Sequence, residues 1–415
     1  MTEFRCVLFL NQYYAPDLAS SGQMLSDLVE GLVEIGHSAT VVCSQPSYES
    51  SVPDASSKEI RAGLEIHRIR MSGTKGRDSL IIRAIGYLRF LLFAWLISRK
   101  LIREEKYDAV IALSNPPFIG IIGALIAKKA SVPFVSVMYD IHPDIVQATN
   151  WVKLPGVFFY LWNSVSTWIV KSAIVVVVLG DGMKRTIVET KGSTHEKVKI
   201  IPVWARPEFM SEDCPSPDTR SKFGISSDEI VILFSGNIGI MQPVDVILHA
   251  ALKTRDKKFR FMFLGGGVGS VKIREFARVN DLLNISVLPY QPFDDFKNIL
   301  LESDICVVSL AEGMERLSVP SRAYTFMSAG KPIIAIMNSK SDVADLVTDW
   351  DCGWVVSEMH TLADLLSDLD NDSSSISRKA LNARNAYTST LGKKASVDSF
   401  SELIFNVTEA QKFNL

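Results

Sequence analysis

Short apolar runs alternate with longer stretches of helical periodicity along the first half of the chain. The apolar runs cover residues 5–10, 39–44, 64–70, 108–113, 133–139 and 173–179, and the helical patterns include 23–35, 80–106, 119–130 and 156–171. The runs are rich in Val, Ile and Leu with little polar alternation, which is typical of parallel strands buried on both faces. Strand and helix in regular alternation predict a doubly wound α/β fold.

The second half repeats this plan. Its apolar runs lie at 229–235, 260–265, 284–290, 304–310, 332–337 and 352–356. A chain of 415 residues is too long for one ordinary core. We therefore expect two Rossmann-like domains, at 1–205 and 225–390, with a polar linker at 210–224. Residues 391–415 are expected to form a helix that returns to the first domain. Ligands bind at the carboxyl ends of such strands, so a cleft between the domains is the expected site.

Composition limits the class of protein. Hydrophobic residues make up 47% of the chain and charged residues 22%, which indicates a globular protein. The net charge of -2 excludes a generally basic nucleic-acid binder. The five cysteines are odd in number and lack zinc-like spacing, so we expect a reducing compartment. The N-terminal residues do not have the pattern of a signal peptide.

Small residues follow several predicted strands. Gly22 opens the helix after the first strand, and Gly236, Asn237 and Gly239 follow the strand at 229–235. Glycines let backbone N–H groups approach a ligand, and a helix N-terminus favours an anion. The stretch 264-LGGGVGS-270 is another glycine-rich strand end. An ordinary helix cap, for Gly22, and a flexible turn, for 264–270, remain alternatives.

The stretch 314-MERLSVPSRAYTFMSAGKPIIAIM-337 contains a helical run from Arg322 that stops at Gly330. Pro320, Ser321 and Arg322 are crowded at its start. Helix amides, a hydroxyl and a guanidinium together make a good phosphate site. The alternative is a capped helix with a solvated arginine, and a proline at the helix start fits both interpretations.

A third group of polar residues follows the strand at 133–139. Asp140, His142 and Asp144 lie at its carboxyl end, where side chains should point toward a ligand. A single histidine is more often structural than catalytic. Its position between two carboxylates keeps both roles open.

These segments together resemble the family 4 retaining glycosyltransferases of the GT-B architecture. The residues that carry the resemblance are 11-NQYYAPDLASSGQM-24, 36-GHSATVV-42, 138-MYDIHPD-144, 235-SGNIGIMQPVD-245 and 319-VPSRAYTFMSAGKPIIA-335. Within the family, the chain is most similar to bacterial enzymes of O-antigen, capsule and colanic-acid assembly, the fucosaminyltransferase-like group. The resemblance implies two Rossmann-like domains that face each other across a cleft.

The chain departs from the family pattern at two places. Leu317 and Thr325 stand where most members carry a pair of glutamates, and Asn237 and Gln242 stand where they carry an arginine and a lysine. The resembled subgroup has Pro-Ser-Lys or Pro-Ser-Arg at 320–322. We infer that Arg322 supplies the charge for a nucleotide-sugar diphosphate that the absent bases would supply.

The resemblance also implies an activity and its residues. It implies transfer of a sugar, with retained configuration, from a nucleoside diphosphate sugar to a saccharide in surface polysaccharide assembly. We expect a UDP-sugar donor, no cofactor and no obligatory metal, since no Asp-x-Asp metal motif lies in the segments that carry the resemblance. The expected catalytic residues are Asp140, His142 and Arg322. The expected donor-binding residues are Gly22, Gly236, Asn237, Gly239, Gln242, Tyr290, Glu315, Arg316, Pro320, Ser321 and Arg322.

The stretch 80–108 carries basic and aromatic side chains on an apolar helix, which suits a membrane interface. Its uncharged run, Leu91 to Ser98, is too short to span a bilayer, which takes about 20 apolar residues. We expect a cytoplasmic protein, peripheral on the inner face of the cell membrane, with a polyprenyl-diphosphate-linked acceptor as the resemblance implies. A packed domain helix with solvated ends is the alternative. The segment 151–170 adds a second aromatic stretch.

Two other functions remain open at this point. A nucleotide-sugar 2-epimerase shares the GT-B architecture but needs an acid/base set in the cleft. A non-catalytic nucleotide-sugar-binding scaffold would account for the missing glutamate pair.

Overall fold

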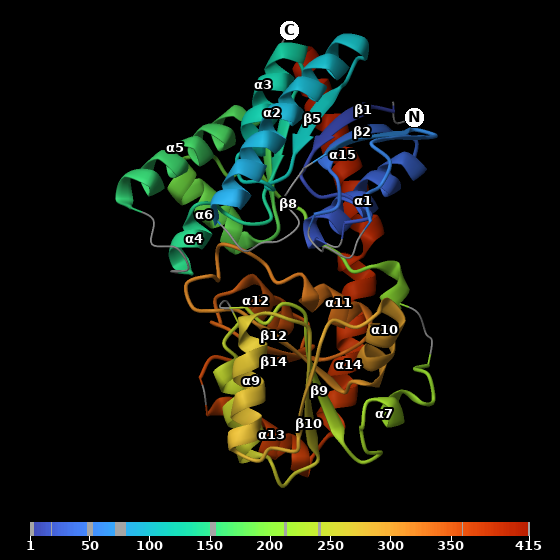
Figure 1. Cartoon of the computed structure of the whole chain (residues 1–415), viewed down its shortest axis with the longest axis vertical. Coiled ribbons are helices and arrows are strands. Elements are labelled where there is room, and N and C mark those ends of the chain that lie inside the picture. Colours follow the sequence, from blue (N-terminus) through green and yellow to red (C-terminus); the bar gives the residue numbers. More distant parts are fainter. Residues whose placement is uncertain are drawn as a thin grey trace. The chain divides into compact units, whose positions relative to one another are not determined.

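The computed structural model describes residues 4–17, 19–47, 53–70, 80–149, 155–210, 214–239, 242–358 and 360–413. The chain forms two compact units. Unit 1 comprises Met1–Ile145, Leu154–Val203 and Lys393–Leu415, and unit 2 comprises Val146–Lys153 and Trp204–Gly392. Each unit contains one sheet flanked by helices (Figure 1). The predicted doubly wound α/β fold is confirmed.

The sheet of unit 1 has the order β3-β4-β2-β1-β5-β6-β7-β8. All neighbours pair in parallel except β3 and β4. The pattern did not predict β3, an exposed edge strand, or β8, which has three residues. The strands are β1 (Cys6–Leu10), β2 (Ser38–Ser44), β3 (Lys58–Arg61), β4 (Leu64–Ile69), β5 (Ala109–Ala112), β6 (Phe134–Val137), β7 (Val175–Val178) and β8 (Val198–Ile200).

The helices of unit 1 cover both faces of this sheet. Right-handed crossovers place the helix between β1 and β2 on one face and those between β4 and β8 on the other. The last helix packs against the first, where a Cβ on Gly31 would lie 2.7 Å from Val397. The helices are α1 (Ser20–Glu34), α2 (Leu80–Glu104), α3 (Ile119–Ala130), α4 (Asp144–Ala148), at the boundary of the two units, α5 (Gly156–Ser172), α6 (Asp181–Lys191) and α15 (Lys393–Phe413).

Unit 2 is built on a fully parallel sheet of order β11-β10-β9-β12-β13-β14. The strands are β9 (Ile230–Ser235), β10 (Phe259–Leu264), β11 (Ile285–Leu288), β12 (Ile305–Ser309), β13 (Ile333–Ile336) and β14 (Gly353–Val356). The helices are α7 (Thr219–Lys222), α8 (Val244–Lys253), α9 (Val268–Val279), α10 (Phe293–Glu302), α11 (Arg322–Ser328), α12 (Asp342–Asp349), α13 (Thr361–Asn371) and α14 (Ser374–Ala386), with a 3-10 turn at Pro207–Met210 and a π turn at Tyr387–Leu391. Phe261, Ile305 and Ile334 lie in its core.

The stretch expected to be a linker is largely part of unit 2. Helix α7 packs against α10, Ser216 N donates to Asn298 Oδ1 at 3.0 Å, and Arg220 pairs with Glu302 at 3.0 Å. The expectation of a linker at 210–224 is therefore wrong for residues 214–224, which belong to unit 2; residues 211–213 lie outside the described residues. Pro, Ser and charged residues mark a stretch without regular structure, but they do not tell whether it packs.

After β8 the chain passes from unit 1 to unit 2 at residues 203–204 and returns at residues 392–393, and hydrogen bonds within each unit tie these two passages. In unit 2 the buried Tyr387 hydroxyl accepts from Ala205 N at 2.9 Å and donates to Ala205 O at 3.2 Å. In unit 1 Ser396 Oγ donates to Pro202 O at 3.0 Å. In each unit, hydrogen bonds thus join the outgoing segment, at Pro202 or Ala205, to the returning segment, at Ser396 or Tyr387.

Candidate functional site

The glycines after β9 and β10 lie side by side at one edge of the unit 2 sheet. Gly236 N donates to Leu264 O at 2.6 Å, and Ile238 N donates to Gly266 O at 2.7 Å, so the pairing of β9 with β10 continues into both loops. A Cβ on Gly265 would lie only 1.9 Å from Gly236 O. The two glycine-rich stretches that the sequence singled out therefore form one continuous backbone surface.

Arg322 rests directly on the first of these glycines. A Cβ on Gly236 would lie 2.0 Å from Arg322 Nη2, and Gly236 has φ +108°, a conformation that side chains rarely adopt. The guanidinium carbon also lies 5.5 Å from the centroid of the Phe234 ring. The fold thus brings Arg322, from the start of α11, onto the carboxyl end of β9.

Two of the expected anion ligands already have partners within the protein. Gly239 N donates to Gln242 Oε1 at 2.9 Å, so this amide and this side chain satisfy each other. Helix α11 has only seven residues, and its Ala323 and Tyr324 amides donate to Pro320 O and Ser321 O, each at 3.2 Å. The Ser321 side chain caps no amide of the helix. The positive character at this edge therefore rests on the Arg322 side chain more than on free helix amides.

Tyr290 and the segment before α11 border the glycine surface. Tyr290 is 54% exposed, and its ring lies 3.2 Å from where a Cβ on Gly266 would be. Glu315 Oε1 accepts from Gly313 N at 3.0 Å, which folds the carboxylate back onto its own loop. Arg316 is half-buried beside it. Asn237 is exposed next to Gly236. An aromatic ring beside open backbone is a surface on which a planar group can stack.

A second polar cluster lies in unit 1, after β6. The His142 ring stacks on Trp162 of α5 with centroids 5.8 Å apart and an interplanar angle of 13°, and Trp162 in turn contacts Phe118 at 5.3 Å. Asp144 pairs with Lys191 at 2.5 Å, and Lys191 Nζ also donates to Asn163. The expected catalytic residues Asp140 and His142 are both half-buried here.

Lys191 is a member of this cluster that the sequence did not indicate. It is the last residue of α6, and from the sequence alone a lysine at that position is explained by the favourable interaction of a cation with a helix C-terminus. In the fold its side chain is completely buried beneath the loop that carries His142. A buried charge needs a partner, and Asp144 provides it.

Burial moves the pKa values of the two expected catalytic groups in opposite directions. It raises the pKa of Asp140 to about 6 and lowers that of His142 to about 4. Asp144 raises and Lys191 lowers the pKa of His142, but both act less strongly than burial. Near neutral pH the cluster therefore holds an ionised Asp140 and a neutral imidazole that can accept or donate a hydrogen bond.

Gly22 belongs to a third strand end, after β1. A Cβ there would lie 2.9 Å from Tyr13 Cβ, so glycine is required for α1 to approach this loop. Gly22 N donates to Ala19 O at 2.9 Å, and Asn115 Nδ2 donates to Ser21 Oγ at 3.0 Å. The structure explains Gly22 by packing, and its expected contact with a donor stays a prediction.

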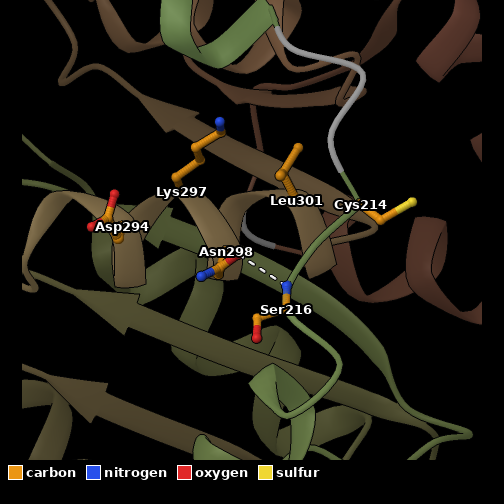
Figure 2. A pocket seen from close by; sticks show the side chains of 6 residues that line it. All are labelled: Cys214, Ser216, Asp294, Lys297, Asn298 and Leu301. Atoms are coloured by element: carbon orange, nitrogen blue, oxygen red, sulfur yellow. Dashed lines mark hydrogen bonds between the residues drawn. The ribbon is translucent and has the colours of Figure 1, made fainter.

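Two hollows elsewhere contain none of the predicted site residues. One, of about 440 Å³, lies in unit 2 between α10 and the segment that begins at Cys214 (Figure 2). Ser216 N donates a hydrogen bond to Asn298 Oδ1 there. Cys214, Asp294, Lys297 and Leu301 complete its lining. The other, of about 290 Å³, lies in unit 1 and is lined by Tyr14, Glu59, Arg61 and Arg68 among others. Neither includes Gly236, Arg322 or Asp140, but the second borders the loop after β1, which contributes Tyr14 to its lining.

Comparisons with known proteins match both units. Residues 21–204 match the family described as "Glycosyl transferase 4-like domain", and residues 215–387 match "Glycosyl transferases group 1". The chain is 26% identical to "Probable glycosyltransferase WbjE" of Pseudomonas aeruginosa over 63% of this chain and 65% of that protein. It is 22% identical to "Putative colanic acid biosynthesis glycosyl transferase WcaI" of Escherichia coli (strain K12) over 80% of this chain and 83% of that protein.

Solved structures share the fold. Sucrose-phosphate synthase of Thermosynechococcus elongatus superposes with a TM-score of 0.76 over 98% of this chain and all of that chain, at 14% identity. Anabaena Alr3699/HepE in complex with UDP-glucose gives 0.67 over 98% of this chain and all of that chain, at 15% identity. These likenesses show the GT-B fold.

Replacing Gly236 by alanine should destabilise unit 2. The new methyl group would collide with the Arg322 guanidinium and hold a non-glycine residue at φ +108°. Overpacking and the left-handed conformation together should cost about 2–4 kcal/mol. Thermal melts would measure the loss. Gly313→Ala is the matched control, because Gly313 has φ +83° with nothing within 4 Å of the added atom.

The double variant Gly236→Ala with Arg322→Ala separates the two causes. Without the guanidinium the collision disappears, so the double variant should be more stable than Gly236→Ala alone. If Gly236→Ala is no worse than Gly313→Ala, or if the double variant recovers nothing, Arg322 does not rest on Gly236 in solution.

The stability of unit 1 should depend on pH through two opposing groups. With its pKa raised to about 6, Asp140 stabilises the fold when protonated, and this contribution is lost as pH rises from about 4 to 6. With its pKa lowered to about 4, His142 destabilises the fold in acid, and this cost disappears over the same interval.

Urea unfolding at several pH values tests this balance. Between about pH 4 and 6 the stability of Asp140→Asn should rise more steeply with pH than that of the wild type, and the stability of His142→Gln should rise less steeply or fall. Equal slopes for all three proteins would mean that the surroundings of Asp140 and His142 shift neither pKa.

Proposed function

We propose that this chain transfers a sugar from a nucleoside diphosphate sugar, because it belongs to the glycosyltransferases that combine a "Glycosyl transferase 4-like domain" with a "Glycosyl transferases group 1" domain. The observation that carries the proposal is the contact of Arg322 with Gly236 at the carboxyl end of β9. There a cation lies on half-buried backbone, at the sheet edge where α/β proteins bind ligands. The acceptor in this proposal is a saccharide of a surface polysaccharide.

The donor site of the proposal is the edge formed by Gly236, Gly266, Tyr290 and Arg322. Arg322 binds the diphosphate, and the Tyr290 ring stacks with the base or flanks it. The loop is shaped by Asn237, Gly239 and Gln242, which supply no charge. Gly239 N donates a hydrogen bond to Gln242 Oε1 within this loop. UDP is the proposed nucleotide. The structural likeness to HepE, solved with UDP-glucose, supports this choice.

The chemistry we propose leaves the anomeric configuration unchanged. As the sugar leaves the diphosphate, negative charge grows on the phosphate, and a preorganised cation stabilises that charge. Arg322 is this cation. The leaving phosphate accepts the proton of the acceptor hydroxyl, so no pair of carboxylates is needed. Asp140 and the neutral His142 bind hydroxyl groups of the transferred sugar or the acceptor in this scheme.

The proposed acceptor is lipid-linked and belongs to bacterial polysaccharide assembly. The name of WcaI, a relative that matches over most of its length, refers to colanic acid biosynthesis. The names of these relatives do not favour an epimerase or a non-catalytic scaffold. O-antigen or capsule as the product, a deoxyaminohexose as the sugar, and the cytoplasmic face of the cell membrane as the location remain proposals.

Arg322→Ala should weaken UDP binding by about 2–3 kcal/mol, roughly 30- to 150-fold, because one charge-assisted contact is lost. Isothermal calorimetry with UDP and with GDP would measure it, after a thermal-shift panel of nucleotide sugars has identified the better ligand. Arg255→Ala is the control, because Arg255 is an exposed surface cation paired with Asp256 at 3.6 Å. Unchanged affinity in Arg322→Ala would refute the assignment of the donor site.

Transfer should retain configuration and proceed in EDTA. Proton NMR of the anomeric signal of the first product, from a reaction with excess EDTA, tests both statements. An inverted product or abolished activity in EDTA would contradict the scheme. Incubation with the donor alone is the companion measurement, since an epimer formed there would favour the epimerase.

A further inference from the structure

Helix α2 is apolar on two opposite faces. Its buried face includes Phe90, Ala94 and Leu101, which recur at helical spacing. Its other face carries exposed apolar side chains three or four residues apart: Ile85, Leu88, Leu92 and Leu96. Leu88, in the interior of this 25-residue helix, is 67% exposed. The first face packs in unit 1, and the second has no cover within the described chain.

Helix α5 has the same construction. Ser166, Ile169 and Val170 are buried, whereas Val157, Leu161 and Trp168 form an exposed stripe with Ser164. Tyr160 is 69% exposed. A globular protein rarely leaves so many large apolar groups together in water without a partner.

Helix α3 joins these two helices into one surface. It packs against both α2 and α5 in the layer on one face of the sheet (Figure 1). Its exposed side chains include Leu125, Lys128 and Lys129. We call this surface the α2–α3–α5 face. Its exposed large apolar residues are Ile82, Ile85, Leu88, Leu92, Phe93, Leu96, Leu125, Val157, Phe158, Tyr160, Leu161 and Trp168.

The charge of the three helices is strongly one-sided. Their sequences contain eight Lys or Arg residues and a single acid, Glu104, in a chain whose net charge is -2. Arg103 and Lys100 are exposed in the last turns of α2, and Lys100 lies 3.7 Å from Glu104. The side chain of Arg83 lies outside the described residues. The apolar stripe of α2 thus runs into a cationic end.

We propose that the α2–α3–α5 face docks on an anionic lipid bilayer. Apolar and aromatic side chains bordered by lysine and arginine match both parts of such a surface, the acyl boundary and the phosphate groups. Contact with a second copy is disfavoured by charge. A two-fold dimer would place this face against itself and oppose its exposed lysines and arginines to their own copies.

The helices lie on the bilayer and do not cross it. Within the described part of the chain, no helix is long and apolar enough to span a membrane. Helix α5 also connects this face to the polar cluster of unit 1, because its Trp162 stacks on His142. A lipid-linked saccharide held at the bilayer would therefore reach unit 1 beside a helix that also contributes to the cluster. Bilayer docking itself does not require the proposed sugar transfer.

Vesicle co-sedimentation tests the charge. The full chain should sediment with vesicles of equal phosphatidylcholine and phosphatidylglycerol and remain in the supernatant with phosphatidylcholine alone. The variant Lys100, Arg103, Lys128 and Lys129→Gln should bind at least about a hundredfold more weakly, since each cation near an anionic surface contributes roughly fivefold. The control is Lys253, Arg255, Lys272 and Arg274→Gln, which removes four cations from unit 2 and should bind like the wild type.

The apolar part is tested separately. Leu88, Leu92 and Leu161→Ser should weaken binding about tenfold or more, including the fraction that survives salt near 1 M, where the Debye length is about 3 Å. Val279, Leu283 and Leu381→Ser, exposed apolar residues of unit 2, form the matched control. Thermal melts and the UDP-induced thermal shift show whether each variant is folded and still binds nucleotide.

Three results would overturn the proposal. The wild type could stay in the supernatant with anionic vesicles at low salt, or the unit 2 controls could lose as much binding as the test variants. Alternatively, sedimentation velocity could show a dimer that the Leu→Ser variant abolishes, so that a second copy covers the face. Loss of the UDP shift with vesicle binding intact would instead count against the proposed function alone.

Discussion

Parallel pairing around β9 is the constraint on which the unit 2 site depends. Strand β9 lies between β10 and β12, and all three run in the same direction, so the segments that follow them emerge at one edge. The backbones there approach so closely that Gly265 leaves no room for a side chain. Arg322 occupies the space above Gly236. A cation is thus fixed at the strand ends by packing before any ligand arrives.

Unit 1 uses the same kind of edge with different chemistry. The loop after β6 is held by a stack of His142 on Trp162 and by the buried pair of Lys191 with Asp144. A buried ion pair adds little net stability, because desolvation offsets its attraction, but losing one partner leaves an uncompensated charge. We infer that Lys191 fixes the position of the loop. The neutral imidazole of His142 near pH 7 follows from the same burial.

Burial of apolar surface explains most of the helices and leaves one exception. A helix in this fold needs one apolar face, which it turns to the sheet. Helices α2 and α5 carry a second apolar face, and α3 lies between them with lysines at its end. The low net charge of the whole chain conceals this surface, because acidic residues elsewhere balance its cations. The distribution of charge, and not its sum, determines what such a surface attracts.

The sequence by itself determined the class of fold and the places where ligands are expected. Uninterrupted Val, Ile and Leu runs indicate strands buried on both faces, and glycines directly after them mark close backbone approach; both features are local. Gly236 and the helix that begins at Arg322 were therefore predictable, as was the end of that helix near Gly330, which has φ +67°.

Only the tertiary structure decided which groups these residues meet. It paired Gly239 with Gln242, buried Lys191 under His142, and packed residues 214–224 into unit 2. It also decided which apolar face of α2 is covered, since both faces have the same periodicity in the sequence. Periodicity records which residues share a face of one element. Burial and hydrogen bonding depend on what a different part of the chain, often more than a hundred residues away, places against that face.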